Sequence, residues 1–333
     1  MSELYPLKFE PILKEKLWGG TSLAAHYGKK QGDLKNIGES WELSAVSDNL
    51  SEVSNGFLAG NNIEEIIEVY MGDITGERVY EKFGNEFPLL IKLIEARDDL
   101  SVQVHPGDAL AKERHNAYGK TEMWHILKSD AGARIYSGFS GQISRDAYLS
   151  AVRNNTIGNI LNIETAEAGD TFFTPAGRIH AIGAGIVLAE IQQTSDITYR
   201  IYDWGRKDKN GKPRELHNDL AVDAIDFLQT GKSKIKKDLL KNRTENLVSC
   251  EYFNTNILWF DKLITRDYNI IDSFVIYICT DGAFRIKWDS GSEKVSKGET
   301  VLLPAMIRDV ELIPEPDAAL LETYITEKGI ILS

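Results

Sequence analysis

The chain has 333 residues, of which 42% are hydrophobic and 26% are charged, as expected for a globular protein with a sizeable buried core. Its 38 basic and 50 acidic residues give a formal net charge of −12. Such an acidic balance argues against nucleic acid or an anionic membrane as a partner, because both require a basic face.

Short apolar runs, separated by Gly, Pro, Asn and Asp, predict many short strands. In chain order they cover residues 88–95, 100–105, 122–127, 133–138, 171–174, 186–191, 198–203, 257–264, 273–280, 283–288, 300–303 and 319–326. Helical periodicity is confined to residues 63–71, 108–116, 145–154 and 216–228. Asn62 and Ser144 are expected N-caps, since their side chains can accept from free backbone amides. The fold class is therefore mainly β, a sandwich or barrel with a few helical insertions.

An eight-residue pattern occurs twice along the chain. Gly169-Asp-Thr-Phe-Phe-Thr-Pro-Ala176 returns as Gly298-Glu-Thr-Val-Leu-Leu-Pro-Ala305. The first copy continues to His180, whereas no histidine follows the second. Two related β-barrels explain the pattern, and chance similarity over eight residues is the alternative.

A polar, lysine-rich stretch over residues 230–245 is the best candidate for a linker between the two barrels. We expect a catalytic domain over residues 1–240, with helical insertions, and a degenerate C-terminal domain over residues 246–333 that lacks metal ligands. The second domain should cover apolar surface of the first through strands such as residues 274–278 and 320–324.

The N-terminal residues lack the basic start and apolar stretch of a secretory signal, and no run approaches the roughly 18 apolar residues of a membrane span. The two cysteines, Cys250 and Cys279, are expected to be free thiols in a reducing compartment. We therefore expect a cytoplasmic protein with no membrane partner.

The spacing Gly169-x5-Pro175-x-Gly177-x2-His180 is that of the second cupin motif. In such a segment a turn, a short strand and a second turn direct the histidine into the barrel. Alternate residues of neighbouring strands converge there, so His180 is expected to have partners. Each of the two expected domains is accordingly a cupin, or jelly-roll, barrel.

Residues 100–106 supply candidate partners for His180. Ser101, Gln103 and His105 alternate with aliphatic residues, so a strand places these three side chains on one face. Glu122 opens the next expected strand, and by the same alternation His125 points away from it.

Two imidazoles, one carboxylate and one amide oxygen suit Zn²⁺ with a position open for water or substrate. The two histidines and the carboxylate alone also describe the facial triad of non-haem iron. A hydrogen-bonded polar cluster without any metal is the structural alternative. The sequence thus predicts one metal ion per chain, zinc or another divalent metal, at Gln103, His105, Glu122 and His180.

The chain resembles the short bacterial form of the type I mannose-6-phosphate isomerases, within the cupin superfamily. The resemblance extends over the whole chain, and its motifs are together highly specific. They are Lys16-Leu-Trp-Gly-Gly20, Gly38-Glu-Ser-Trp-Glu-Leu-Ser44, Pro88-Leu-Leu-Ile-Lys-Leu-Ile94, Ser101-Val-Gln-Val-His-Pro106, Gly119-Lys-Thr-Glu-Met-Trp124, the segment ending at His180, and Glu190-Ile-Gln-Gln-Thr-Ser-Asp-Ile-Thr-Tyr-Arg200.

The resemblance implies that mannose 6-phosphate and fructose 6-phosphate are interconverted through a cis-enediol. The zinc ligands of the family fall on the four residues given above, its active-site arginine on Arg200, and its pocket lysine and acid on Lys120 and Glu190. Arg200 and Lys120, with Ser101, are candidates for binding the substrate. Glu190 is the first candidate for the general base, because a carboxylate with a raised pKa commonly has that role; a metal-bound hydroxide or a histidine are its rivals.

One segment departs from the family. Its longer eukaryotic members have Asn-His-Lys-Pro-Glu where this chain has Tyr118-Gly-Lys-Thr-Glu122, so the lysine and the glutamate match but the histidine is missing. Two other functions are compatible with the candidate ligands: an iron-dependent cupin dioxygenase, and a non-catalytic cupin that binds sugars as a regulator. A dioxygenase would not need Arg200 or Lys120.

Overall fold

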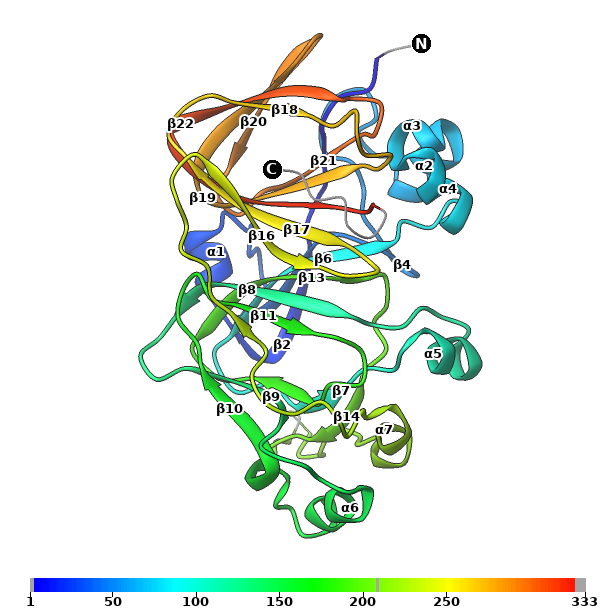
Figure 1. Cartoon of the computed structure of the whole chain (residues 1–333), viewed down its shortest axis with the longest axis vertical. Coiled ribbons are helices and arrows are strands. Elements are labelled where there is room, and N and C mark those ends of the chain that lie inside the picture. The colour runs from blue at the N-terminus through cyan, green and yellow to red at the C-terminus, as the bar shows by residue number, and fades with distance from the viewer. Residues whose placement is uncertain (1–2, 208–209, 327–333) are drawn as a thin grey trace.

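Two β-barrels lie one above the other along the long axis of the molecule, with most of the helices along one side and at one end (Figure 1). The structure is a computed structural model that describes residues 3–207 and 210–326. The lower barrel in Figure 1 is formed mainly by the middle of the chain, and the upper one mainly by the C-terminal third.

The lower barrel consists of two antiparallel sheets with an apolar core between them. The seven-stranded sheet has the order β15 (Lys234–Ile235), β11 (Thr171–Thr174), β8 (Glu122–Ser129), β13 (Ile186–Gln193), β6 (Leu89–Ala96), β3 (Ile37–Leu43), β2 (Ile12–Gly20). The five-stranded sheet has the order β10 (Leu161–Thr165), β9 (Arg134–Phe139), β12 (His180–Ile182), β7 (Val102–Val104), β14 (Tyr199–Tyr202). A separate hairpin joins β4 (Ala45–Val46) to β5 (Asn49–Leu50).

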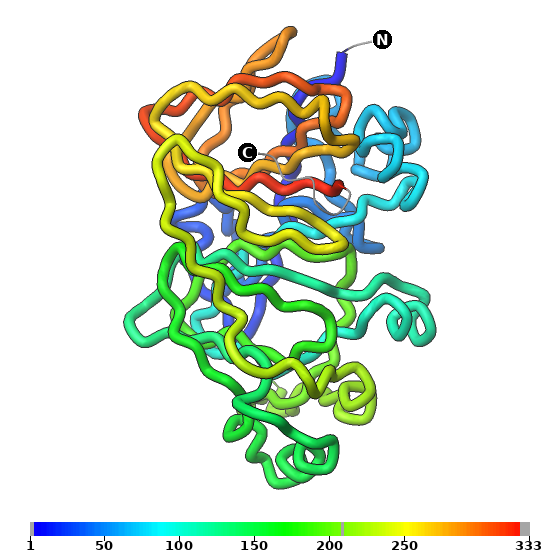
Figure 2. The backbone as a smooth tube through the Cα atoms, in the orientation of Figure 1, coloured from blue at the N-terminus to red at the C-terminus, as the bar shows by residue number. Residues whose placement is uncertain are grey.

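The upper barrel is one eight-stranded sheet. Its main path is β1 (Leu7–Lys8), β21 (Thr300–Leu303), β19 (Val275–Trp288), β22 (Asp309–Tyr324), β17 (Asn254–Phe260), β16 (Arg243–Ser249), while β18 (Ile264–Asp267) pairs with β22 and β20 (Gly291–Ser296) pairs with β19. Strand β1 comes from the beginning of the chain and pairs with β21, so the N-terminal segment runs along the C-terminal barrel (Figure 2). The N-terminal end of the chain therefore contributes one strand to the C-terminal barrel.

All four expected helices are present, as α2 (Ile63–Tyr70), α5 (Asp108–His115), α6 (Arg145–Arg153) and α7 (Asn218–Ala224). Both predicted N-caps are confirmed. Asn62 accepts from the amides of Glu64 and Glu65 at 3.0 Å, and Ser144 accepts from the Ala147 amide at 3.2 Å. Among the described residues, no helix is long and apolar enough to cross a membrane.

Four short helical segments have no counterpart in the sequence prediction. They are α1 (Ser22–His26), α3 (Gly72–Thr75), α4 (Glu77–Phe83) and the 3-10 helix η1 (Ile157–Ile160). Each has seven residues or fewer, which is too short for the 3.6-residue periodicity to stand out.

The predicted strands are present, with three differences at the C-terminal end. The strand expected over residues 319–326 begins at Asp309, as β22 (Asp309–Tyr324). The expected strand over residues 257–264 is divided between β17 and β18. The expected strands over residues 273–280 and 283–288 are one strand, β19, because Asp281-Gly282 forms a bulge where a turn was expected, with Gly282 at φ +67°. Strands β2, β3, β10, β16 and β20 were not expected, since polar residues interrupt their apolar pattern.

The repeated pattern forms the same turn in both barrels. Gly169 and Gly298 have φ angles of 89° and 85°. The acid after each glycine, Asp170 or Glu299, accepts from the backbone amide three residues before it, at 2.9 and 2.7 Å. A strand then follows in each copy, β11 and β21, so the similarity is structural and not a chance match of eight residues.

The sheet that contains β6, β8 and β13 is buried on both faces. In β6, Ile94 points into the lower barrel, whereas Ile91 and Leu93 point toward the upper one. There they join a core that also contains Ile276 and Ile278 of β19. The C-terminal barrel thus covers apolar surface of the first barrel, as the sequence predicts.

Candidate metal centre

The two sheets of the lower barrel both contribute to one cluster of polar side chains. Gln103 on β7 and His180 on β12 are direct cross-strand partners in the five-stranded sheet, and His105 follows β7. Glu122 is the first residue of β8 in the facing sheet. As predicted from alternation, Val102 and Val104 point out of the barrel, into the core beneath α6 and α7.

His105, Glu122 and His180 each offer a ligand atom, and these atoms all lie within 4.8 Å of one another. His105 Nε2 is 3.5 Å from Glu122 Oε2, and His180 Nε2 is 3.3 Å from Glu122 Oε1. All three side chains are at most 1% exposed. The side-chain amide of Gln103 lies 3.3 Å from His180 Nε2, and the opposite amide rotamer would present its oxygen there.

The arrangement of these donors fits a divalent metal ion. Nδ1 of His105 lies 2.8 Å from the Ile197 carbonyl, and Nδ1 of His180 lies 2.8 Å from the Arg178 carbonyl. An Nδ1–H that donates to a carbonyl leaves the lone pair of Nε2 free for a metal. His105 Nε2 and both Glu122 oxygens are buried and have no hydrogen-bond partner among the described residues, an expensive state for polar atoms that a cation would relieve.

The protonation states of the two histidines also favour a metal ion at this place. Burial lowers the pKa of His180 to about 4 and that of His105 well below its usual value, so both imidazoles are neutral near pH 7. Burial raises the pKa of Glu122 to about 8, against the effect of Lys120, whose Nζ lies 3.3 Å from Oε2. A divalent cation in this place would favour the ionised carboxylate.

A cavity of about 470 Å³ lies beside the cluster. Five residues singled out in the sequence line it, namely Ser101, Gln103, Lys120, Glu190 and Arg200. Ten further polar or aromatic lining residues were not foreseen as site residues: Lys14, Lys16, Trp18, Glu39, Trp41, Asn49, Lys92, Asp196, Thr198 and Arg214. Of these, Lys92 carried a detectable signal, since it is a charged residue with apolar residues on both sides of it in strand β6.

Arg200 and Lys120 reach the cavity from opposite sheets. Arg200 on β14 is the cross-strand partner of Gln103. Its Nη1 donates to the Glu215 carbonyl at 2.9 Å, whereas its buried Nε has no partner among the described residues. Lys120 is 5% exposed and precedes β8. Ser101 is also buried and donates weakly to Gln103 at 3.5 Å.

Glu190 does not have the raised pKa on which its choice as general base depended. Its carboxylate pairs with Lys92 at 3.0 Å and accepts from Trp124 Nε1 at 2.9 Å. Burial opposes ionisation, but Lys92 and then Lys120 outweigh it and lower the pKa of Glu190 to about 2. The expectation of a raised pKa is therefore wrong, because the sequence did not reveal the lysine across the sheet.

His125 points away from the cluster, as predicted. Its Nδ1 lies 3.0 Å from the Thr171 hydroxyl, and burial lowers its pKa to about 4.

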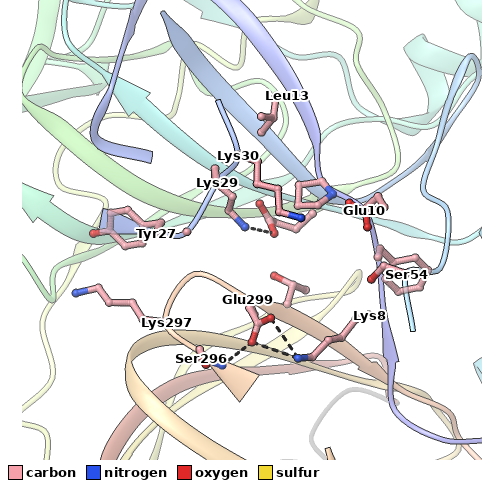
Figure 3. Close-up of a pocket in the computed structure, with 15 residues that line it drawn as sticks. Lys8, Glu10, Leu13, Tyr27, Lys29, Lys30, Ser54, Ser296, Lys297 and Glu299 are labelled. Carbon is pink, nitrogen blue, oxygen red and sulfur yellow. Dashed lines mark hydrogen bonds and ion pairs between the residues drawn. The ribbon is translucent and has the colours of Figure 1, made fainter. Parts of the chain in front are cut away.

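A second cavity, of about 430 Å³, lies between the barrels and contains several lysines (Figure 3). Two of its cations are already neutralised: Lys29 pairs with Glu42 at 2.6 Å, and Lys8 with Glu299 at 3.2 Å. This second cavity and the cavity beside the His–Glu–His cluster lie on opposite faces of β2. Leu13 lines the second cavity, whereas the next residue, Lys14, lines the cavity beside the cluster.

Fold and candidate site together define a two-barrel cupin protein with a buried His–Glu–His group that could hold a metal ion. Residues 6–124 match the family model of the catalytic domain of type I phosphomannose isomerase. A mannose-6-phosphate isomerase of Bacillus subtilis is 36% identical over 258 residues, which cover 75% of this chain and 78% of that protein. A putative mannose-6-phosphate isomerase of the same organism is 31% identical over 310 residues, 91% of this chain and 94% of the relative. The chain belongs to the type I phosphomannose isomerase family.

Solved structures agree with this assignment. The crystal structure of the mannose 6-phosphate isomerase from B. subtilis matches with a TM-score of 0.84 at 29% identity, over 97% of this chain and all of that one (100%). A putative mannosephosphate isomerase from Archaeoglobus fulgidus, at 21% identity and a TM-score of 0.79, has the same fold. The predicted fold class, mainly β with two cupin barrels, is confirmed, and the family assignment favours an isomerase over a dioxygenase or a regulator.

Proposed function

We propose that the protein is an aldose–ketose isomerase that interconverts mannose 6-phosphate and fructose 6-phosphate. Family membership supports the reaction class. The observation in the structure that carries the proposal is the buried group of His105, Glu122 and His180, with unpartnered ligand atoms, beside a cavity lined by cations. Such a cavity suits an anionic sugar.

Gln103, His105, Glu122 and His180 are the proposed ligands of one Zn²⁺, since neutral imidazoles, a carboxylate and an amide oxygen suit that metal. When bound, the metal stabilises negative charge on oxygen and so assists removal of a proton from the neighbouring carbon. Other divalent metals accept the same donors.

Arg200 and Lys120 are proposed to act on the substrate. Conversion of an aldose into a ketose moves a proton between C2 and C1 through a cis-enediol, and negative charge develops on oxygen on the way. The unpartnered Nε of Arg200 and the ammonium of Lys120 are donors at the cavity wall that can bind oxygen as this charge develops. Ser101 adds a hydroxyl on the same side as Gln103.

Glu190 stays in the proposed catalytic set, in a role that fits its low pKa. An ionised carboxylate that pairs with Lys92 at 3.0 Å holds that ammonium at the cavity wall. Lys92 also donates to Gln192 at 2.8 Å, which fixes the ammonium further. A carboxylate with so low a pKa is a weak base, so the role proposed for Glu190 is to hold Lys92 in position and not to remove the proton from carbon.

The proposal is tested by a coupled assay that detects fructose 6-phosphate formed from mannose 6-phosphate, under oxygen-free conditions and in air. Equal turnover in both conditions is expected of an isomerase. Consumption of oxygen that requires ferrous iron, without formation of fructose 6-phosphate, would instead identify a dioxygenase, and binding of the sugar phosphate without either reaction would identify a regulator.

A further inference from the structure

Six cationic side chains line the cavity beside the metal cluster, and four of them form ion pairs with carboxylates. The ion pairs are Lys16–Glu39 at 3.1 Å, Lys92–Glu190 at 3.0 Å, Lys120–Glu122 at 3.3 Å, and Arg214–Asp203. Within the described ranges, Lys14 and Arg200 form no ion pair with a carboxylate. Any anionic group that enters this cavity therefore meets two cations whose charge is not already balanced.

The two unpaired cations lie in different parts of the cavity. Arg200 is the cross-strand partner of the proposed ligand Gln103. Lys14 is on β2, the edge strand of the seven-stranded sheet. Counted from β8, which contains Glu122, the strands of this sheet follow in the order β8, β13, β6, β3, β2. Lys14 is thus on the strand that is four places from the strand of Glu122 in this sheet, while Arg200 is on the strand next to that of Gln103.

The surroundings of Lys14 hold its ammonium in place. Lys14 Nζ donates to the side-chain oxygen of Asn49 in β5, and it lies 5.0 Å from the ring centroid of Trp41. The indole of Trp41 is itself fixed, because its Nε1 donates to Glu39 at 2.7 Å. An ammonium has three donors, so one bond to Asn49 leaves two that can point into the cavity.

We propose that Lys14, supported by Asn49 and Trp41, binds the phosphate group of the sugar phosphate and so determines specificity for phosphorylated sugars. The inference rests on the proposed function, in which C1 and C2 of the sugar lie at the metal cluster and next to Arg200. The phosphate is attached at the other end of the sugar, and Lys14 is the unpaired cation at the other end of the cavity. Lys14 is a binding residue and takes no part in proton transfer.

The test measures binding without turnover, by calorimetry on the metal-loaded full-length protein. Mannitol 6-phosphate, which has no carbonyl to isomerise, is the phosphorylated probe, and inorganic phosphate is the second probe. Lys14→Gln should bind mannitol 6-phosphate about 10- to 100-fold more weakly than wild type, because a charge-assisted hydrogen bond is lost. Lys14→Arg should recover most of the affinity.

Lys30→Gln is the matched control, since Lys30 is an exposed lysine in the inter-barrel cavity and its loss changes the net charge equally. In the coupled assay, Lys14→Gln should raise KM for mannose 6-phosphate about 10-fold or more and leave kcat within a few-fold of wild type. Lys30→Gln should change neither value, and thermal unfolding should show that both variants are folded.

Two results would overturn the proposal: unchanged affinity of Lys14→Gln for mannitol 6-phosphate, or a loss of affinity confined to Arg200→Gln, which would place the phosphate at the metal end. A third result would distinguish a failure of the proposed function from a failure of the phosphate site. If wild type binds mannitol 6-phosphate through Lys14 but does not isomerise mannose 6-phosphate, the phosphate site stands and the isomerase assignment fails.

Discussion

His180 is the proposed ligand whose loss should affect metal binding most directly, because its Nε2 faces Glu122 while its Nδ1 is held by a backbone carbonyl. His180→Ala should reduce the metal content from about one ion per chain to a small fraction, and lower turnover by more than about 10²-fold. Elemental analysis and the coupled assay measure both effects.

His125→Ala is a suitable control for this change, since His125 is equally buried but bonds to Thr171 outside the cluster. It should keep its metal. Full metal content and turnover in His180→Ala would show that the proposed site is wrong.

Arg200→Ala should separate the substrate-binding role from the metal. The side chain lines the cavity but donates only to the Glu215 carbonyl, so its loss should leave metal content and folding intact. Turnover should fall by about 10²–10³-fold, the usual effect of removing a donor near a developing negative charge. An unchanged rate would mean that Arg200 is an ordinary structural residue.

Single residues could be predicted from the sequence where strand alternation alone decides their direction. Gln103 and His105 were placed on one face, and His125 on the face opposite Glu122, and the structure agrees. Alternation does not reveal which strand lies across the sheet. The partnership of Lys92 with Glu190, and with it the low pKa of Glu190, depends on pairing between distant segments and could not be read from the sequence.

At the scale of elements, the repeated turn has different surroundings in the two barrels. A Cβ at Gly298 would lie 2.4 Å from the Tyr27 carbonyl oxygen, whereas a Cβ at Gly169 would meet nothing within 4 Å. Both glycines have positive φ angles, 85° and 89°, so alanine at either position has similar backbone strain.

Gly298→Ala should therefore destabilise the protein more than Gly169→Ala. The strain common to both is about 1–2 kcal/mol, and only Gly298→Ala also forces the second barrel away from the backbone at Tyr27. Thermal unfolding measures the difference between the two variants. Equal losses of stability would show that the close approach of Gly298 to the first barrel contributes nothing.

Elements with several turns or clear alternation were predictable, and short or mixed ones were not. The turn residues Asp281-Gly282 suggested a break between two strands, but β19 continues through them because both halves pair with β22. Helices α3 and α4 are held by packing on the rest of the fold, as Ile74 and Val79 are buried in the core between the barrels. Tertiary contacts of this kind leave no local pattern in the sequence.

For the whole molecule, the proposed role of the C-terminal barrel is structural. Among the residues that the structure describes, none beyond Arg214 lines the cavity beside the metal cluster. The contribution of residues 246–333 is instead apolar: Phe274, Ile276 and Leu321 pack in the core between the barrels. The second domain proposed from the sequence, residues 246–333, has to be extended by β1 from the N-terminal end of the chain, because β1 pairs with β21 of the second barrel.

A fragment of residues 1–245 should consequently aggregate or lose stability, because it exposes the outer faces of β6, β8 and β13 and leaves β1 without its partner. Solubility, thermal unfolding and metal content of the fragment check this outcome. A soluble fragment that unfolds cooperatively and holds metal, yet is inactive, would show that the C-terminal barrel contributes directly to the active site.

The most direct test of the central claim is to follow isomerase turnover against bound metal while a chelator removes the ion and zinc is added back. If His105, Glu122 and His180 hold a catalytic metal, turnover on mannose 6-phosphate should fall in proportion to the metal lost and return as the content approaches one ion per chain. Full turnover in the metal-free protein would contradict the account.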